Sequence, residues 1–143
     1  MQNSKLELKL EIKEIELHPY KLWFKHENNE ADHKFLVYRQ ENSLLLYLSD
    51  TDYHAAIAGR YNLKESNIIG GGDFYLEKEK GKTIFVLSGS SGKYKGIPRE
   101  ILNDFAELLL PELQKYPSLL ERKINIQGYL IERNLDLNDF WKK

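Results

Sequence analysis

Leucine and isoleucine alternate with charged residues near the start of the chain, with the two-residue period of a β-strand that buries one face. The alternating apolar residues are Leu6, Leu8, Leu10 and Ile12. The phase then slips, so that the next apolar residues are Ile15 and Leu17, which predicts a bulge near Lys13 and Glu14. A second apolar run over residues 20–24 predicts another strand, and the two segments would form an N-terminal hairpin.

Two further pairs of apolar runs predict two β-hairpins. Residues 35–38 and 44–48 flank a short polar turn. Residues 74–76 and 83–87 flank a charged run that contains Gly81, and a glycine in such a position is a hairpin signal. These four segments therefore predict antiparallel strand pairs.

Two helices are expected between and after these strands. The first runs from about residue 53 to residue 61, and side chains at 49–52 can cap its N-terminus. The second begins at Pro98, because the missing N–H of proline is not needed in the first turn of a helix. Apolar residues then repeat at helical spacing, and Pro111 within the repeat predicts a kink or a break.

The order of elements is strands, helix, strands, helix and strand, since Ile124 and Ile126 alternate as a last strand. Residues 128–143 are less regular and suggest a short helix. This order is typical of an α+β fold with a mixed, mostly antiparallel sheet flanked by two main helices. A length of 143 residues predicts a single domain over residues 1–143.

The composition narrows the classes of function. A net charge of -1 gives no overall attraction to nucleic acid or to an anionic membrane. The absence of cysteine excludes disulfides, thiolate metal sites and cysteine nucleophiles, and His18, His26 and His33 show no metal-ligand spacing. The first residues lack the apolar segment of a signal peptide, and no run is long enough to span a membrane, so we expect a cytoplasmic protein without a bound metal.

His54 is the strongest candidate for a catalytic side chain, because it lies at the expected start of the first helix. The positive end of a helix dipole favours the neutral imidazole, which can accept a proton near neutral pH. Asp50 and Asp52 precede it closely and could orient the ring or raise its pKa. The alternative is a surface histidine without a chemical role.

Two glycine-rich segments follow this histidine. Three consecutive glycines at residues 70–72 cost conformational entropy, which is expected where the backbone approaches a ligand or takes positive φ angles. A wide bulge or a tight entry into a strand is the alternative. The second segment, at 88–96, joins a strand to a helix, and its backbone N–H groups, hydroxyls and two lysines could hold an anion. It lacks the spacing of a Walker A loop, and a flexible loop is the alternative.

Together these segments resemble the phosphohistidine phosphatases of the Janus (Ocnus) family. In that family a Tyr-His-Ala segment carries the catalytic histidine, and residues 53–55 have this sequence. A Leu-Gly-Gly-Gly segment and a Gly-x-Ser-x-x-Tyr-Gly loop follow, to which residues 69–72 and 88–94 are similar. A family lysine on an early strand resembles Lys34. The resemblance implies the family fold for residues 34–126, with the N-terminal hairpin and the C-terminal tail as extensions.

The resemblance also implies hydrolysis of phosphohistidine or phospholysine, without a metal or cofactor, on a phosphorylated protein or a small phosphoramidate. His54 would activate the attacking water or accept the phosphoryl group itself. The residues that would hold the phosphate are Lys34, Gly70, Gly71, Gly72, Ser90, Ser91, Gly92, Lys93 and Lys95. Lys93 or Lys95 would replace the arginine that follows the three glycines in the family, because Asp73 stands there.

Two other functions stay open. Asp73 would repel a phosphate, so the same fold could be a non-catalytic module that binds a phosphorylated ligand or a basic peptide. The chain could also be a protein-interaction domain, because the alternating strand over residues 5–13, if it lies at a sheet edge, could pair with another chain and form a homodimer.

Overall fold

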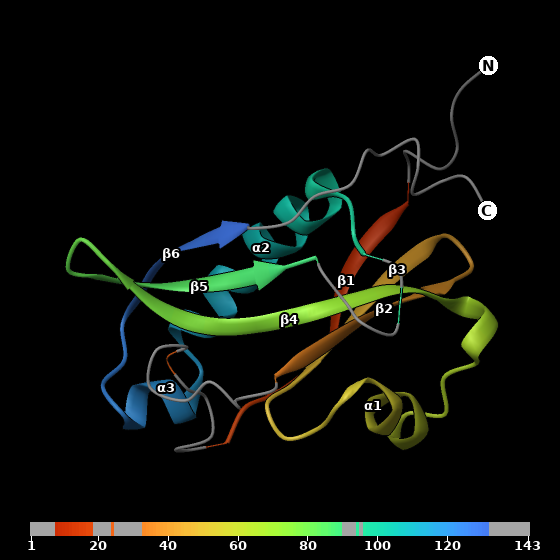
Figure 1. Cartoon of the computed structure of the whole chain (residues 1–143), viewed down its shortest axis with the longest axis horizontal. Helices are drawn as coiled ribbons and strands as arrows, with labels where there is room; N and C mark the ends of the chain where they lie inside the picture. The colour runs from red at the N-terminus through yellow and green to blue at the C-terminus, as the bar shows by residue number, and fades with distance from the viewer. Residues whose placement is uncertain (1–7, 19–23, 25–32, 90–93, 95, 132–143) are drawn as a thin grey trace.

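The computed structural model describes residues 8–18, 24, 33–89, 94 and 96–131. Six strands form one mixed sheet in the order β1-β3-β2-β4-β5-β6 (Figure 1). They are β1 (Lys9–Glu16), β2 (Lys34–Gln40), β3 (Ser43–Ser49), β4 (Ile68–Glu79), β5 (Lys82–Ser88) and β6 (Ile126–Ile131). The four central strands pair antiparallel, whereas β1 and β6 add at the edges in parallel. The predicted α+β fold with a mostly antiparallel sheet is confirmed.

The two main helices cover opposite faces of this sheet (Figure 1). Besides the 3-10 turn η3 (Glu65–Asn67), the helices are α1 (His54–Arg60), α2 (Arg99–Gln114) and α3 (Pro117–Glu121). Alternation along β2 sends Phe35 and Val37 to the face under α2, and Leu36 and Tyr38 to the face under α1. A central strand with both faces buried explains why residues 35–38 form a continuous apolar run.

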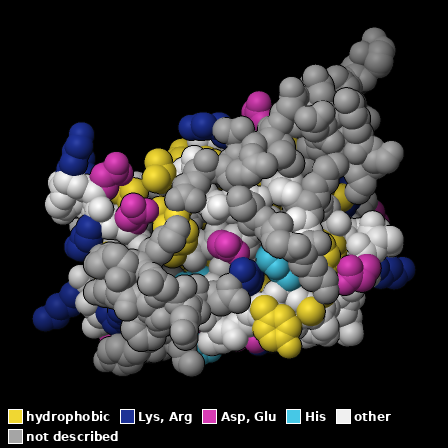
Figure 2. Space-filling model, in the orientation of Figure 1, with side chains coloured by type: hydrophobic (Ala, Val, Ile, Leu, Met, Phe, Trp, Pro, Cys, Tyr) yellow, Lys and Arg dark blue, Asp and Glu magenta, His cyan; other side chains and the backbone are white. Residues whose placement is uncertain are grey.

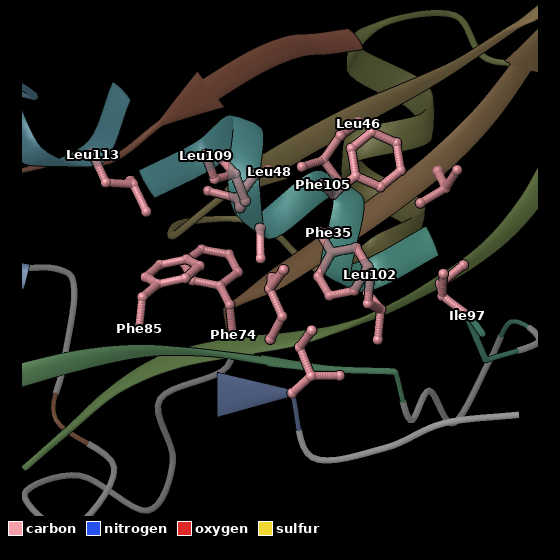
Figure 3. Packing of buried hydrophobic residues seen from close by; sticks show 14 of the residues in the cluster. Phe35, Leu46, Leu48, Phe74, Phe85, Ile97, Leu102, Phe105, Leu109 and Leu113 are labelled. Atoms are coloured by element: carbon pink, nitrogen blue, oxygen red, sulfur yellow. The ribbon is translucent and has the colours of Figure 1, made fainter. Parts of the chain in front are cut away.

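The larger hydrophobic core lies between α2 and the sheet. Phe105 is fully buried at the centre of α2 and faces aromatic and aliphatic side chains of the sheet, as Figure 3 shows. The rings of Phe74 and Phe85 on neighbouring strands stack with centroids 5.4 Å apart. This core holds the sheet rigid beneath the opposite face, on which α1 lies.

Two sequence signals for irregular backbone are confirmed. The register of β1 against β3 shifts between Ile12 and Glu14, so the bulge predicted near Lys13 is present. The β4–β5 hairpin turns at Lys80 and Gly81, which have φ angles of 52° and 80°. Two positive φ angles in a two-residue loop suit the right-handed twist of the strands that it joins.

The glycine triplet lies within a strand and takes none of the positive φ angles that we considered for it, and a register shift directly precedes it. Residues 70–72 lie inside β4, where they pair in register with the apolar run of β2. β4 pairs with β5 only from Asp73 to Glu79, so the triplet extends beyond the last residue of β5, Ser88. The strand therefore begins at Ile68 and is 12 residues long, because β2 supplies a partner for glycines that have little strand propensity of their own.

Three other expectations at element ends need correction. α1 begins with Tyr53 as its N-cap, which makes no side-chain capping bond, so the polar residues 49–52 do not cap it. Pro111 lies inside α2, which continues to Gln114 without the break that we considered. Residues 126–131 form β6, so the strand extends through the start of the segment where we suggested a short helix.

The expected strand over residues 20–24 falls mostly outside the described residues. Phe24, at its end, makes an isolated parallel bridge with Leu76 of β4. β1 pairs with β3, and the N-terminal hairpin stays a prediction. Residues 132–143 also lie outside the described part of the chain.

Candidate functional site

His54 is the first residue of α1, and its side chain packs down onto the sheet. Only 5% of the residue is exposed to solvent. Its Nε2 atom lies 3.2 Å from the carbonyl oxygen of Gly72 in β4. Because a carbonyl oxygen can only accept a hydrogen bond, Nε2 carries the proton and donates it. In the neutral ring the lone pair therefore lies on Nδ1, and the fold fixes the tautomer of the imidazole.

Glycine at position 71 lets the histidine ring approach the strand this closely. A Cβ atom on Gly71 would lie 3.0 Å from His54 Nε2 and 2.8 Å from the carbonyl oxygen of Phe35. Both distances are shorter than van der Waals contact, so any larger residue would push the ring or the neighbouring strand away. The glycine triplet thus provides a flat surface for the imidazole.

Tyr94 packs against the same ring. The centroids of the His54 and Tyr94 rings are 5.4 Å apart with their planes at 85°, an edge-to-face contact. The Tyr94 hydroxyl donates a hydrogen bond of 2.9 Å to Glu65 in η3. Burial, and then the Glu65 carboxylate, raise the pKa of Tyr94 to about 12, so the phenol stays neutral at physiological pH.

We expect the Glu65→Gln substitution to lower the pKa of Tyr94 from about 12, while burial keeps it above the ordinary value of 10.0. A raised tyrosine pKa means that the folded state holds the proton more tightly than the unfolded chain. The contribution of Tyr94 to the free energy of unfolding is therefore fully present below about pH 10 and is lost as the pH rises to about 12. An NMR titration of the tyrosine ring carbons measures this, with Tyr94→Phe to assign the signal. The exposed Glu79→Gln change is the control, and an unchanged Tyr94 pKa in Glu65→Gln would contradict the assignment.

Lys34 and Asp73 form an ion pair near the histidine. The two residues lie directly opposite each other on β2 and β4, and Lys34 Nζ is 2.7 Å from Asp73 Oδ1. Alternation places Asp73 on the same sheet face as Gly71, which contacts the His54 ring. Asp73 thus holds the lysine that we expected to bind phosphate. Figure 2 shows basic, acidic and histidine side chains next to one another near the middle of one face of the molecule.

The two aspartates before α1 have other partners. Asp50 accepts hydrogen bonds from the backbone N–H of His18 at 2.7 Å and lies 2.9 Å from the Nδ1 atom of the same residue. Asp52 forms an ion pair with Arg60 at the end of α1. These pairings direct both carboxylates away from the role of orienting His54, which the β4 carbonyl oxygen fills instead.

The structure brings three groups of predicted site residues together. His54, the glycine triplet and Lys34 gather around β2, β4 and the start of α1. The remaining predicted phosphate-binding residues, Ser90, Ser91, Gly92, Lys93 and Lys95, lie outside the described residues. β5 ends at Ser88, opposite Asp73, so the chain enters this segment beside the triplet.

Sequence reasoning did not assign a role to Tyr94 or Glu65. Tyr94 belongs to the glycine-rich segment that the family resemblance singled out, so its position was a usable signal. Glu65 lies 29 residues away in an ordinary charged connector, and only the fold brings it to the tyrosine. Across residues 8–18, 24, 33–89, 94 and 96–131, no group of histidine and carboxylate side chains is arranged to hold a metal ion, and no helix is long and apolar enough to cross a membrane.

Comparisons with known proteins do not place the chain in a family. No protein-family model matches it, and neither a curated protein nor a solved structure matches it significantly. The resemblance to phosphohistidine phosphatases therefore stays a prediction. The geometry around His54 is the basis of the function proposed below.

Proposed function

We propose that the protein hydrolyses phosphoramidates such as phosphohistidine or phospholysine, with His54 as the catalytic residue. The observation that carries the proposal is the contact between His54 Nε2 and the Gly72 carbonyl oxygen. It fixes the tautomer and leaves Nδ1 as the basic atom, which is the requirement for a general base or a nucleophile.

In the water route, a lone pair of the water oxygen forms a new P–O bond while the P–N bond breaks. His54 Nδ1 takes the proton of the water, and the departing nitrogen takes up a proton. In the covalent route, Nδ1 forms a new P–N bond while the P–N bond of the substrate breaks and the departing nitrogen takes up a proton. A water oxygen then forms a P–O bond while the new P–N bond breaks. Both routes release phosphate and the unmodified side chain, and both need a neutral imidazole at the start.

The ion pair between Lys34 and Asp73 supports a role in positioning the substrate. An ammonium group has three N–H donors, and the contact with Asp73 fixes where the Lys34 amine lies relative to β4. The half-buried carboxylate of Asp73 would also favour a substrate whose nitrogen carries a proton, because the carboxylate can accept a hydrogen bond from that N–H group.

A non-catalytic phosphate-binding module is the second candidate, and the same ion pair favours it. Asp73 compensates the charge of Lys34, which weakens the electrostatic stabilisation that a transition state needs. Such a module would still bind a phosphorylated ligand through backbone N–H groups and a lysine, but it would release no phosphate.

Phosphate release from peptides that carry phosphohistidine or phospholysine tests the proposal. We expect turnover by the intact protein, and binding of vanadate as a phosphate analogue. Vanadate binding without turnover would support the binding module. Neither binding nor turnover in a folded protein would overturn both candidates.

A further inference from the structure

Among the residues that the structure describes, no strand pairs with the outer edge of β1 over a short window. β1 is the first strand of the sheet order and pairs with β3 on one side only (Figure 1). The Lys9 N–H donates to the carbonyl oxygen of Asn42, so the backbone of Lys9 faces β3. Because backbone groups alternate in direction along a strand, those of Leu8, Leu10 and Ile12 face outward. Within the part of the chain that the structure describes, these outward groups have no hydrogen-bond partner.

Two features close the edge beyond this window. The Tyr116 hydroxyl donates to the carbonyl oxygen of Ile15 at 3.0 Å and accepts from the N–H of Leu17 at 3.3 Å. These contacts occupy the outward groups at the C-terminal end of β1. The bulge between Ile12 and Glu14 interrupts the ladder before that point. The open window therefore covers residues 8–12, and Leu10 is its midpoint.

The sequence of the window is self-complementary about Leu10. If two such strands pair antiparallel with Leu10 opposite Leu10, each Lys9 lies opposite Glu11 of the other strand. Leu8 then lies opposite Ile12. On both sides of the two-fold axis, each lysine faces a glutamate and each apolar side chain faces another apolar side chain.

The neighbouring register lacks this complementarity. Shifting the strands so that Leu10 lies opposite Ile12 keeps the outward groups paired, but it places Glu11 opposite Glu11 and Lys9 opposite Lys13. Like charges directly opposite each other on paired strands are destabilising. The charge pattern thus selects one antiparallel register and disfavours sliding along the edge.

A groove of mixed character lies beside the same edge. It has a volume of about 470 Å³ and runs between β1 and α2. Its apolar lining comes from Leu10, Ile12, Ile15, Leu108 and Tyr116, and its charged lining from Glu11, Lys13, Glu14 and Glu112. Leu108 is 42% exposed, although it lies on α2, the helix that covers the larger hydrophobic core. The apolar side chains of the window are half-buried and pack against the larger core, whereas Lys9 and Glu11, which alternate with them along the strand, are exposed.

We propose that β1 pairs with β1 of a second copy of this chain, antiparallel and centred on Leu10. Each pair of outward residues would exchange two hydrogen bonds, so that the two sheets become one. The apolar stripes of both strands would lie side by side beneath the two Leu108 side chains, and the Lys9–Glu11 pairs would lie on the opposite face. The proposal is independent of the hydrolytic function.

A charge swap tests the register. We expect Lys9→Glu alone and Glu11→Lys alone each to raise the dissociation constant of the dimer about tenfold or more, because each change makes both cross-strand pairs repulsive. The double variant Lys9→Glu/Glu11→Lys should restore the dimer, since the opposite charges then face each other again. Sedimentation velocity of the full chain over a range of concentrations measures this.

Matched control variants distinguish a contact at the β1 edge from a general effect of new surface charges. Leu108→Arg should weaken the dimer, whereas Leu120→Arg, at a position that is 57% exposed outside the groove, should not. Lys82→Glu at the exposed start of β5 should have no effect either. A protein that stays monomeric at the highest concentration would overturn the proposal. The proposal would also be overturned if the single charge reversals left the dissociation constant unchanged, or if the double variant did not restore it.

Discussion

Replacement of His54 by alanine is expected to reduce the rate of phosphoramidate hydrolysis by about 10²–10⁴-fold, the usual loss when a positioned acid–base group is removed. The physical reason is the fixed tautomer. The contact of Nε2 with the Gly72 carbonyl oxygen leaves Nδ1 as the group that takes a proton or a phosphoryl group, and alanine has neither nitrogen. The rate of phosphate release from a phosphohistidine peptide measures the effect.

Two further measurements distinguish the loss of the catalytic nitrogen from a structural effect of the substitution. Added imidazole should restore part of the rate in His54→Ala, because it can occupy the space left by the ring and supply the missing nitrogen. The control is His18→Ala, since the side chain of this histidine is 44% exposed and its partner is Asp50. If His54→Ala folds and retains the full rate, the histidine is not the catalytic residue.

The substitution Gly72→Ala is expected to lower the free energy of unfolding by about 3 kcal/mol or more, at the upper end of what overpacking costs. A Cβ atom at this position would lie 2.0 Å from the carbonyl oxygen of Ser88 and 2.7 Å from the Phe35 ring. The first neighbour is backbone, so relief requires β5 to move away from β4. Urea unfolding with a constant m-value measures the loss.

Gly59→Ala is the matched control for this change. Gly59 lies in α1, and a Cβ atom there would meet nothing within 4 Å. Alanine should stabilise the protein by about 0.5–1 kcal/mol, because glycine loses more conformational entropy in a helix. A Gly72→Ala protein as stable as the original would show that β5 can shift at little cost, and would contradict the close packing described above.

The local elements of this chain could be predicted from the sequence because their signals are local. The alternation around Leu10 specifies a strand with one buried face, and its change of phase specifies the bulge. The glycine in the β4–β5 turn takes a positive φ angle that other residues adopt at a cost. The helical spacing of apolar residues after Pro98 specifies α2, because a helix on a sheet must bury one stripe.

The glycine triplet shows where such reasoning stops. Glycine favours loops in isolation, and although a tight entry into a strand was one alternative for residues 70–72, the sequence does not indicate that their partner is the apolar run of β2. Only the folded sheet shows that Gly71 is required by the His54 ring and Gly72 by Ser88 and Phe35. Tertiary pairing overrides the local preference, since each strand pair contributes more than the propensity of single residues.

The site divides in the same way. The sequence by itself determined most of the strands, the two main helices, the α+β class and the candidacy of His54, because periodicity and residue type act over a few neighbours. The tertiary structure alone decided the tautomer of His54, the pairing of Lys34 with Asp73 and the contact of Tyr94 with Glu65. Each of these contacts joins residues at least 18 positions apart, and a distance between such residues is set by the packing of the sheet and helices rather than by the chain between them.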